Sequence, residues 1–429
     1  MNSSAYNKEP RTTGDDEVQS ANPRSTQWVL AEEDRRASVW LTTPDPLYRM
    51  TKRPDLYFED QTESVLSADG LTVSFSQHEG QTIEGFGGTF TDAASELFKS
   101  LDEDLQDAIL EAYFGETGIG YTLGKVPINS NDFSNETYSF DDAANDTDLE
   151  QFDHDVSHDV KSIIPMILEA QKKLADTEQE MHLLGVPWSP PGWMKTNGRM
   201  EGSKEPCLDG KMARVWARYI SLWISAYIEK GVPVWAITPQ NDPTADKEWE
   251  ACRYSPEEEA EFIAKHLGPE LSESHPNVKI LAFDGDAELM MNWTNATLKH
   301  SASAKYVSGI AFHWFSGDSF GLIGDVHRQL PDAILLSSLA GYAMPQHWEG
   351  FQPQDAFFAS GDWQHGQGYA HDIIGDLNAG AHGWIDGSLI LNSTGGPNRA
   401  GNLMDAPIMI SGANLSRTVA DLSIRSIIL

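Results

Sequence analysis

Short apolar runs alternate with amphipathic segments along most of the chain, beginning near Gln81. Eight of the apolar runs have the length and composition of buried strands: 83–90, 121–126, 181–186, 234–238, 279–283, 307–312, 333–337 and 382–391. Segments with helical spacing of apolar residues lie between them, for example 92–114, 211–230, 256–271 and 369–379. Eight strands alternating with helices predict an α/β fold, a parallel (β/α)8 (TIM) barrel. A doubly wound open sheet is the structural alternative.

Two of the amphipathic segments begin with recognisable helix starts. Asp92 offers an N-cap side chain, and Ser255 is a cap followed by Pro256 at the first helical position. No Gly-x-Gly-x-x-Gly motif follows any predicted strand, so a dinucleotide-binding fold has no support.

The two ends of the chain predict a small accessory domain beside the barrel. We expect residues 1–25, which are polar and charged, to be disordered, and residues 26–80 to supply strands of a side β-domain. The β-like runs in that region are 28–30, 37–41 and 71–75. The barrel is expected over 81–394, and 395–429 should return to the side domain, with one short helix over 416–429. Because little sequence follows the eighth strand, we expect this last part of the side domain to be incomplete.

The charge balance excludes some classes of partner. Lys and Arg number 30 and Asp and Glu 65, giving a net charge of −35. Nucleic acids and anionic membranes are polyanions, so neither is an expected partner. The chain contains 13 Trp, which suits stacking on sugar rings, although most of these indoles could equally fill the core.

The sequence contains neither an apolar run approaching 18 residues nor an N-terminal apolar stretch typical of a signal peptide. The expectation is therefore a protein without a transmembrane segment, cytoplasmic by default, and secreted or periplasmic if a signal is missing.

Cys207 and Cys252 are too few for a disulfide framework and are expected to be free thiols. There is no metal-binding motif, so no metal or cofactor is expected.

Polar and aromatic residues follow several predicted strands at the point where each strand ends. Carboxylates, amides, a histidine and indoles at one rim of a barrel are typical of a sugar site. Each also has a structural explanation: Asn-Asp-Pro is a good turn tripeptide, Trp188 could be core, His313 a satisfied barrel histidine, and Asp132 a turn cap. The residues concerned are Asp132, Trp188, Asn241, Asp242, His313, Phe315, Trp384 and Asp386.

These segments resemble glycoside hydrolase family 30, the glucosylceramidase-like β-glycosidases. The resemblance implies a (β/α)8 barrel with a side β-sandwich built from both chain ends, and a retaining mechanism that uses two glutamates and no cofactor. One glutamate, the general acid/base, follows the fourth strand, and the other, the nucleophile, follows the seventh. The matching segments are Gln81-Thr82-Ile83-Glu84-Gly85-Phe86-Gly87-Gly88, Thr91-Asp92-Ala93-Ala94, 186–197, 235–243, Phe312-His313-Trp314 and Gly395-Gly396-Pro397-Asn398.

The sequence departs from the family at both catalytic positions. Asp242 stands at the acid/base position, one methylene shorter than Glu, and Leu339 stands at the nucleophile position. Leu339 cannot act as a nucleophile, and the nearest carboxylates in sequence are Asp332, at the start of that strand, and Glu349, in a loop. Neighbouring positions differ too: Lys125 replaces an Arg, Phe315 a Tyr, and Gly387-Ser388 a Trp-Asn pair.

The positions that contact substrate match the family better. The resemblance implies that Asp132, Trp188, Asn241, Trp384 and Asn398 hold the sugar, with His313 and Phe315 beside them. Asn241 would bind the 2-hydroxyl next to the acid/base.

Three hypotheses follow from the sequence. The first is a retaining β-glycosidase whose partner is a β-glucoside, glycolipid or oligosaccharide, with activity impaired at Leu339. The second is a glycan- or glycolipid-binding pseudoenzyme on the same scaffold. The third is a poorly folding relative, which a broad, non-cooperative thermal melt would support. Aglycone, linkage and oligomeric state have no signal in the sequence.

Overall fold

The computed structural model describes residues 36–43, 51–57, 80–299, 301–344, 363–410 and 423–424. The chain divides into two compact units, 1–73 and 74–429. In the first unit, β1 (Arg36–Leu41) and β2 (Thr51–Tyr57) form an antiparallel pair, which confirms the strand predicted at 37–41. The runs 28–30 and 71–75 and the polar segment 1–25 lie outside the described residues.

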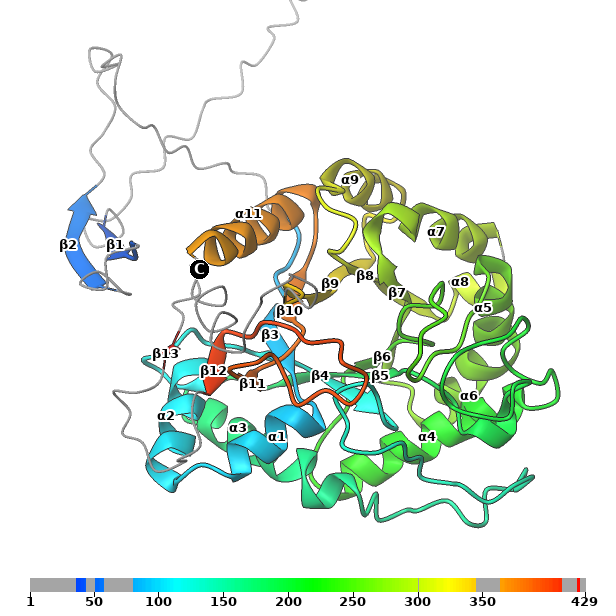
Figure 1. Ribbon diagram of the computed structural model, residues 1–429. Helices are drawn as coiled ribbons and strands as arrows, with labels where there is room; N and C mark the ends of the chain where they lie inside the picture. Colours follow the sequence, from blue (N-terminus) through cyan, green and yellow to red (C-terminus); the bar gives the residue numbers. More distant parts are fainter. Residues whose placement is uncertain are drawn as a thin grey trace, which may run out of the picture. The chain divides into compact units, whose positions relative to one another are not determined.

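Eight parallel strands of the second unit close into a barrel (Figure 1). They follow chain order around it, and β10 pairs with both β9 and β3. The (β/α)8 prediction is confirmed, and the alternative of an open sheet is wrong. The strands are β3 (Gly85–Thr89), β4 (Leu123–Ile128), β5 (His182–Pro187), β6 (Ala236–Ile237), β7 (Lys279–Asp286), β8 (Val307–His313), β9 (Ile334–Ala340) and β10 (Gly383–Asp386).

Helices surround these strands (Figure 1). The segment predicted at 92–114 is two helices, because the chain breaks at Ser100 and Asp102 caps the second one. Ser255 forms a full capping box with Glu258, as expected for a helix start. The α-helices are α1 (Asp92–Lys99), α2 (Glu103–Phe114), α3 (Ile163–Ala175), α4 (Ala213–Glu229), α5 (Pro256–Phe262), α6 (Gly268–Ser274), α7 (Met290–Lys299), α8 (Ser301–Ala304), α9 (Phe320–Gln329) and α11 (Trp363–Ala379). Shorter turns are η2 (Asp159–Lys161), η3 (Gly192–Met194), the π-helical η4 (Ile263–Leu267) and η5 (Ala287–Leu289).

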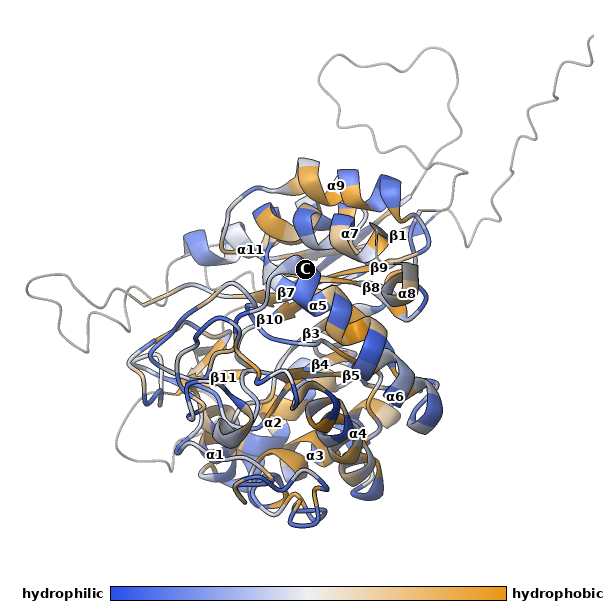
Figure 2. Cartoon of the chain, turned by 90° about the vertical axis from the view of Figure 1, so that its right-hand side faces the viewer, coloured by the Kyte–Doolittle hydropathy of each residue, from blue (hydrophilic) through white to orange (hydrophobic). Residues whose placement is uncertain are grey.

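The core has two layers, and both follow from residue spacing. In α4, Trp216, Ile220, Trp223 and Tyr227 recur at helical spacing and are fully buried against the strands. The same amphipathic pattern is visible in Figure 2, where hydrophobic and hydrophilic residues alternate along α5 and α9. The inner layer fills the barrel with alternate strand residues: Leu123, Leu184, Val186, Ala236, Leu281, Ala311, Leu336 and Ile385.

Two predictions near the C-terminus are corrected. The strand expected over 382–391 is two strands, because the chain leaves the barrel after Asp386 and continues as β11 (Ile390–Asn392) in a separate sheet. That sheet also contains β12 (Ile408–Ile410), parallel to β11, and β13 (Ser423–Ile424), antiparallel to β12. The short helix expected over 416–429 is therefore wrong at Ser423–Ile424, and the rest of that range lies outside the described residues.

The expectation of free thiols is also wrong. Cys207 and Cys252 form a disulfide, with Cα atoms 5.5 Å apart. Cys207 follows β5 in sequence and Cys252 follows β6, so the bond links two loops that neighbouring barrel strands bring together. Buried Lys195 joins the same loops, because its ammonium group donates to the carbonyl oxygens of Met200, Gly202 and Ala251 at 2.7, 2.8 and 2.6 Å.

Candidate active site

A cavity of about 280 Å³ opens at the carboxyl ends of the barrel strands. Every strand, or the loop after it, contributes at least one lining residue, as expected for the catalytic face of such barrels. In order around the mouth these are Thr89 (β3), Asp132 (after β4), Trp188 (after β5), Asn241 and Asp242 (after β6), Asp286 (β7), His313 (β8), Leu339 (β9) and Gly387 (after β10).

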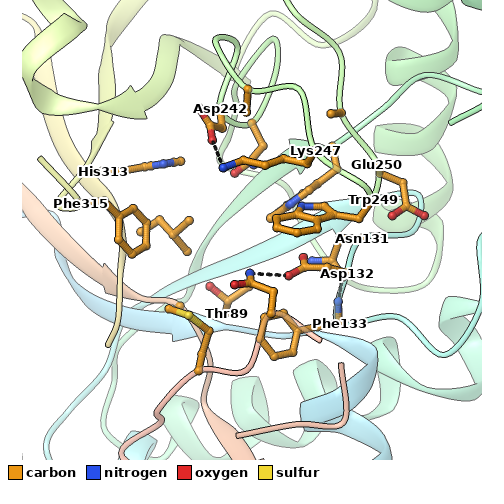
Figure 3. A pocket seen from close by; sticks show the side chains of 18 of the residues that line it. Thr89, Asn131, Asp132, Phe133, Asp242, Lys247, Trp249, Glu250, His313 and Phe315 are labelled. Atoms are coloured by element: carbon orange, nitrogen blue, oxygen red, sulfur yellow. Dashed lines mark hydrogen bonds and ion pairs between the residues drawn. The ribbon is translucent and has the colours of Figure 1, made fainter. Parts of the chain in front are cut away.

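Figure 3 shows how the labelled side chains face one another across the cavity. His313 and Phe315 lie on one side, and Asn131, Asp132 and Trp249 lie on the other. The cavity thus has one side that is rich in aromatic rings and another that combines hydrogen-bonding groups with an indole. Such a mixture suits a sugar, whose hydroxyls need planar partners and whose ring faces need apolar contact.

Three of the predicted site residues, Trp384, Asp386 and Asn398, do not line the cavity, and Asp386 is fully buried on β10. Trp384 is only 1% exposed and packs between β10 and α11, where its indole N–H donates to Asp372 at 2.9 Å. Strand alternation explains this, because Ile385 takes the inward position and Trp384 the outward one. Asn398 instead supports the site from behind, because its side-chain amide donates to the Asp132 carboxylate at 2.9 Å.

The other predicted residues are brought together at the cavity: Asp132, Trp188, Asn241, Asp242, His313, Phe315 and Leu339. Leu339 is on β9, three strands from β6, and Asp242 follows β6, so these two side chains line one cavity from separate parts of its rim. Asp332 precedes β9 and is therefore at the opposite end of the barrel, as predicted. Glu349 lies outside the described residues.

Main-chain hydrogen bonds fix the segment that carries Asn241 and Asp242. The Asn241 N–H donates to the carbonyl of Pro187 at 2.8 Å, and the Asp242 N–H donates to that of Asp284 at 2.7 Å. Asp242 has a left-handed backbone, with φ of 42°. Its carboxylate accepts from the Thr244 hydroxyl at 3.1 Å and lies 3.9 Å from the Lys247 ammonium group. The side chain is thus positioned from β5 and β7, the strands on either side of β6.

Asp284 is a buried residue next to the site that sequence reasoning missed. It is fully buried beneath the cavity, and its carboxylate lies 3.4 Å from Lys125 Nζ and 3.0 Å from His313 Nε2. The hydroxyls of Ser338 and Thr238 donate to it as well. Burial by itself would raise the pKa of Asp284, but Lys125, His313 and Ser338 hold it at about 2. The run Asp284-Gly285-Asp286 directly after an apolar strand was the signal that could have revealed it.

A bulge in β7 aims Asp284 into this network. Phe283 and Asp284 have φ of 75° and 82°, and the pairing with β8 shifts register between Phe283 and Gly285. Two consecutive left-handed non-glycine residues are unfavourable and require support from their surroundings. Buried Glu259 supplies it, accepting from the Phe283 N–H at 2.8 Å and from the Trp293 indole at 3.2 Å. Burial raises the pKa of Glu259 to about 8.

Three further acidic side chains line the cavity. Burial raises the pKa of Asp132. Hydrogen bonds from Asn402 and Asn398, each of 2.9 Å, act in the opposite direction but do not offset it. Glu250 accepts from Ser130 and Arg399, and burial raises its pKa too. Asp286 is partly buried; burial raises its pKa, and the charge of Asp242 acts in the same direction. Among the residues described, no group of three or more His, Cys, Asp or Glu could hold a metal ion.

A closed (β/α)8 barrel with carboxylates, amides and indoles around its carboxyl-end mouth defines the class of barrel glycosidases. The chain belongs to glycosyl hydrolase family 30, because the model of that family's TIM-barrel domain matches residues 83–417. As the resemblance implied, it is a glucosylceramidase-like member of this family of glycoside hydrolases.

Relatives support this assignment. Putative glucosylceramidase 4 of Caenorhabditis elegans is 37% identical over 341 residues, which are 77% of this chain and 63% of the relative. Lysosomal acid glucosylceramidase of Mus musculus is 35% identical over 77% of this chain and 64% of its own length. The chain thus spans less than two thirds of these curated relatives. The crystal structure of SrfJ from Salmonella typhimurium superposes with a TM-score of 0.76 at 33% identity, covering 87% of this chain and 78% of SrfJ.

In the part of the chain that the structure describes, no helix is long and apolar enough to cross a membrane.

Proposed function

We propose that this chain is a β-glycosidase of glucosylceramidase type that binds a β-glucosyl unit in the 280 Å³ cavity and hydrolyses it slowly. Asp242 is the general acid/base, and Asp132, Trp188 and Asn241 hold the sugar. The observation that carries the proposal is that Asp242 and Leu339 line one cavity from β6 and β9, the strands that bear the two catalytic groups in the family.

Double displacement explains why the activity should be low. Retention requires two carboxyl groups roughly 5–5.5 Å apart, one protonating the leaving oxygen and the other attacking the anomeric carbon. Leu339 offers no lone pair for that attack. Asp242 is also one methylene shorter than Glu, and a displacement of about 1 Å can cost on the order of 10²-fold in rate.

The surroundings of Leu339 support the assignment. Phe315 lines the cavity beside it without a hydroxyl, so no polar group is left facing an apolar side chain. His313, the β8 partner of Leu339 in register, points its imidazole to Asp284 instead.

The test is hydrolysis of an aryl β-glucoside by the wild type and a set of variants. We expect Leu339→Glu to gain activity, Leu339→Glu with Asp242→Glu to gain more, and Leu339→Gln, which has the shape of Glu without its charge, to gain none. Wild-type turnover at an ordinary enzymatic rate, on the order of 1–10³ per second, would contradict the role of Leu339. So would folded glutamate variants that gain nothing.

A second candidate function is glycan binding without catalysis. It is favoured by the retained sugar-holding set, since Asp132 and Trp188 are in place while the nucleophile position is apolar. Calorimetry with glucose, cello-oligosaccharides and gentio-oligosaccharides tests it, and absence of binding at millimolar ligand argues against it.

The disulfide bears on where this function is carried out. Disulfides form and persist mainly in oxidising compartments. The Cys207–Cys252 bond therefore favours a secreted or periplasmic protein over the cytoplasmic default. Alkylation of the protein isolated from its native source, with and without prior reduction, distinguishes the two.

A further inference from the structure

Asn241 presents a buried acceptor to the cavity without a partner in the described structure. The residue is only 9% exposed, lines the cavity and immediately precedes Asp242. Its side-chain oxygen, Oδ1, has no hydrogen-bond partner, although the main chain of Asn241 is fully engaged with Pro187 and Gln240. Leaving a buried acceptor unpaired costs about 1–3 kcal/mol. The structure therefore calls for a ligand that brings an N–H or O–H donor to this point, next to the acid/base.

The wall that includes the family's nucleophile position is apolar. Leu339, Phe315, Ala343 and Met404 all line the cavity there. Gly387, the next lining residue around the mouth, adds no side chain, and a Cβ on it would lie 3.4 Å from Leu339 Cδ1. This part of the cavity is suited to a small apolar group on the ligand, such as a methyl.

Of the carboxylates that line the cavity, Asp132, Glu250 and Asp405 are each engaged by hydrogen bonds from neighbouring side chains, which leaves Asp286 to be compared with Asp242. Asp242 and Asp286 are carried by neighbouring strands, and the Asp242 N–H bonds to the main chain only two residues before Asp286. Two carboxyl groups on one side of a sugar cannot protonate the leaving oxygen and also attack from the opposite face. A substrate that carries its own nucleophile removes this requirement, as glycosidases using a 2-acetamido group demonstrate.

We propose that this cavity accepts 2-acetamido-2-deoxy-β-glycosides and that the acetamide of the substrate serves as the nucleophile. The inference rests on the proposed role of Asp242 as acid/base. Asn241 Oδ1 accepts the acetamide N–H, and Leu339 and Phe315 contact its methyl group. The amide oxygen is thereby held toward the anomeric carbon, in the place of the missing glutamate.

The reaction balances with water as the only co-reactant. The acetamide oxygen forms a bond to the anomeric carbon while the bond from that carbon to the leaving oxygen breaks. The Asp242 carboxylic acid donates its proton to the leaving oxygen, producing an alcohol and a bicyclic oxazolinium. Water then attacks the anomeric carbon, passes a proton to the Asp242 carboxylate and restores the acetamide, with net retention.

The test compares wild-type hydrolysis of 4-nitrophenyl β-glucoside with that of its 2-acetamido-2-deoxy counterpart. We expect kcat/KM for the acetamido substrate to be higher by about tenfold or more, because its acetamide supplies a nucleophile within the bound substrate and the glucoside has none. Successive fluorination of the acetyl group weakens its oxygen as a nucleophile, so kcat should fall progressively from mono- to trifluoroacetamide. Asp242→Asn should lower the rate by about 10²-fold or more.

Leu339→Glu is the variant that should reverse the preference between the two substrates. This variant should shift preference toward the glucoside and lose acetamido activity, because the charged side chain occupies the position of the methyl. Trp235→Phe, which alters an indole that stacks on His182 away from the cavity lining, is the control and should retain the wild-type preference.

Three results would overturn the inference: no cleavage of the acetamido substrate, equal or better cleavage of the glucoside by the wild type, or rates indifferent to fluorination. These are separable from failure of the proposed function. If the glucoside is bound or cleaved and the acetamido substrate is not, only the present inference fails. If Asp242→Asn leaves the cleavage of both unchanged, the acid/base assignment fails with it.

Discussion

The main-chain N–H of Asp242 donates a 2.7 Å hydrogen bond to the main-chain carbonyl of Asp284. This bond joins Asp242, the proposed acid/base, to the main chain of Asp284, whose fully buried carboxylate lies against Lys125 and His313. The geometry of the loop after β6, which carries Asp242, thus depends on the bulge in β7 and on the charge pair beneath it. The first two predictions concern the stability contributed by the buried carboxyl groups that support this arrangement.

Replacing Asp284 should be strongly destabilising. Asp284→Asn leaves the ammonium group of Lys125 buried without its counter-charge, which typically costs about 3–5 kcal/mol. Urea denaturation should show a correspondingly lower free energy of unfolding. Asp325→Asn is the matched control, because Asp325 pairs with Arg328 at the surface, where ion pairs contribute about 0–1 kcal/mol. Equal losses in the two variants would contradict the prediction.

Glu259 should make stability depend on pH. Folding raises its pKa from the ordinary 4.5 to about 8, so between these values the folded state keeps a proton that the unfolded state releases. Its contribution to stability is fully present below about pH 4.5 and is lost as the pH rises through about 8.

We therefore expect Glu259→Gln to abolish this part of the slope when free energies of unfolding are measured from pH 5 to 9. Glu257→Gln, an exposed position on the same helix, is the control and should leave the slope unchanged. A Glu259→Gln profile parallel to the wild type would show that Glu259 is ionised in the folded protein.

The disulfide should contribute substantially to stability. Cys207 and Cys252 are 45 residues apart, and loop-closure entropy for that length corresponds to about 4 kcal/mol. Adding a reductant should lower the urea midpoint of the wild type toward that of the Cys207→Ser, Cys252→Ser double variant. The double variant itself should not respond to reductant. A wild-type midpoint that is the same with and without reductant would count against the bond.

Trp249 should contribute to ligand binding. It lines the cavity from the loop that follows β6, lies beside Lys247, whose Nζ is 5.6 Å from its ring centroid, and faces the side that bears His313. Losing an aromatic contact of this kind costs about 0.5–1.5 kcal/mol beyond area burial. Trp249→Ala should therefore weaken the binding of glucose, cello-oligosaccharides or gentio-oligosaccharides several-fold in calorimetry. Trp235→Phe, which alters an indole that stacks on His182 away from the cavity lining, should not.

The sequence by itself determined the barrel and the position of its site. Strand and helix periodicities are local properties, so the alternation from Gln81 onward was sufficient to predict eight strands and a closed α/β architecture. Because all carboxyl ends of a parallel barrel meet at one face, residues such as Asp132, Trp188 and Asp242 could be assigned to a common rim without coordinates.

The tertiary structure decided two kinds of feature. One kind depends on the exact register of a strand, and the other depends on contacts between segments that are distant in sequence. A single step along β10 separates outward Trp384 from inward Ile385, and apolar spacing does not reveal that step in a strand buried on both faces. Asp284 acquires its role from a left-handed bulge and from Lys125, His313 and Ser338, which three other strands supply. Whether two cysteines pair depends on a 5.5 Å separation between loops that are far apart in sequence, a distance that composition and spacing do not encode.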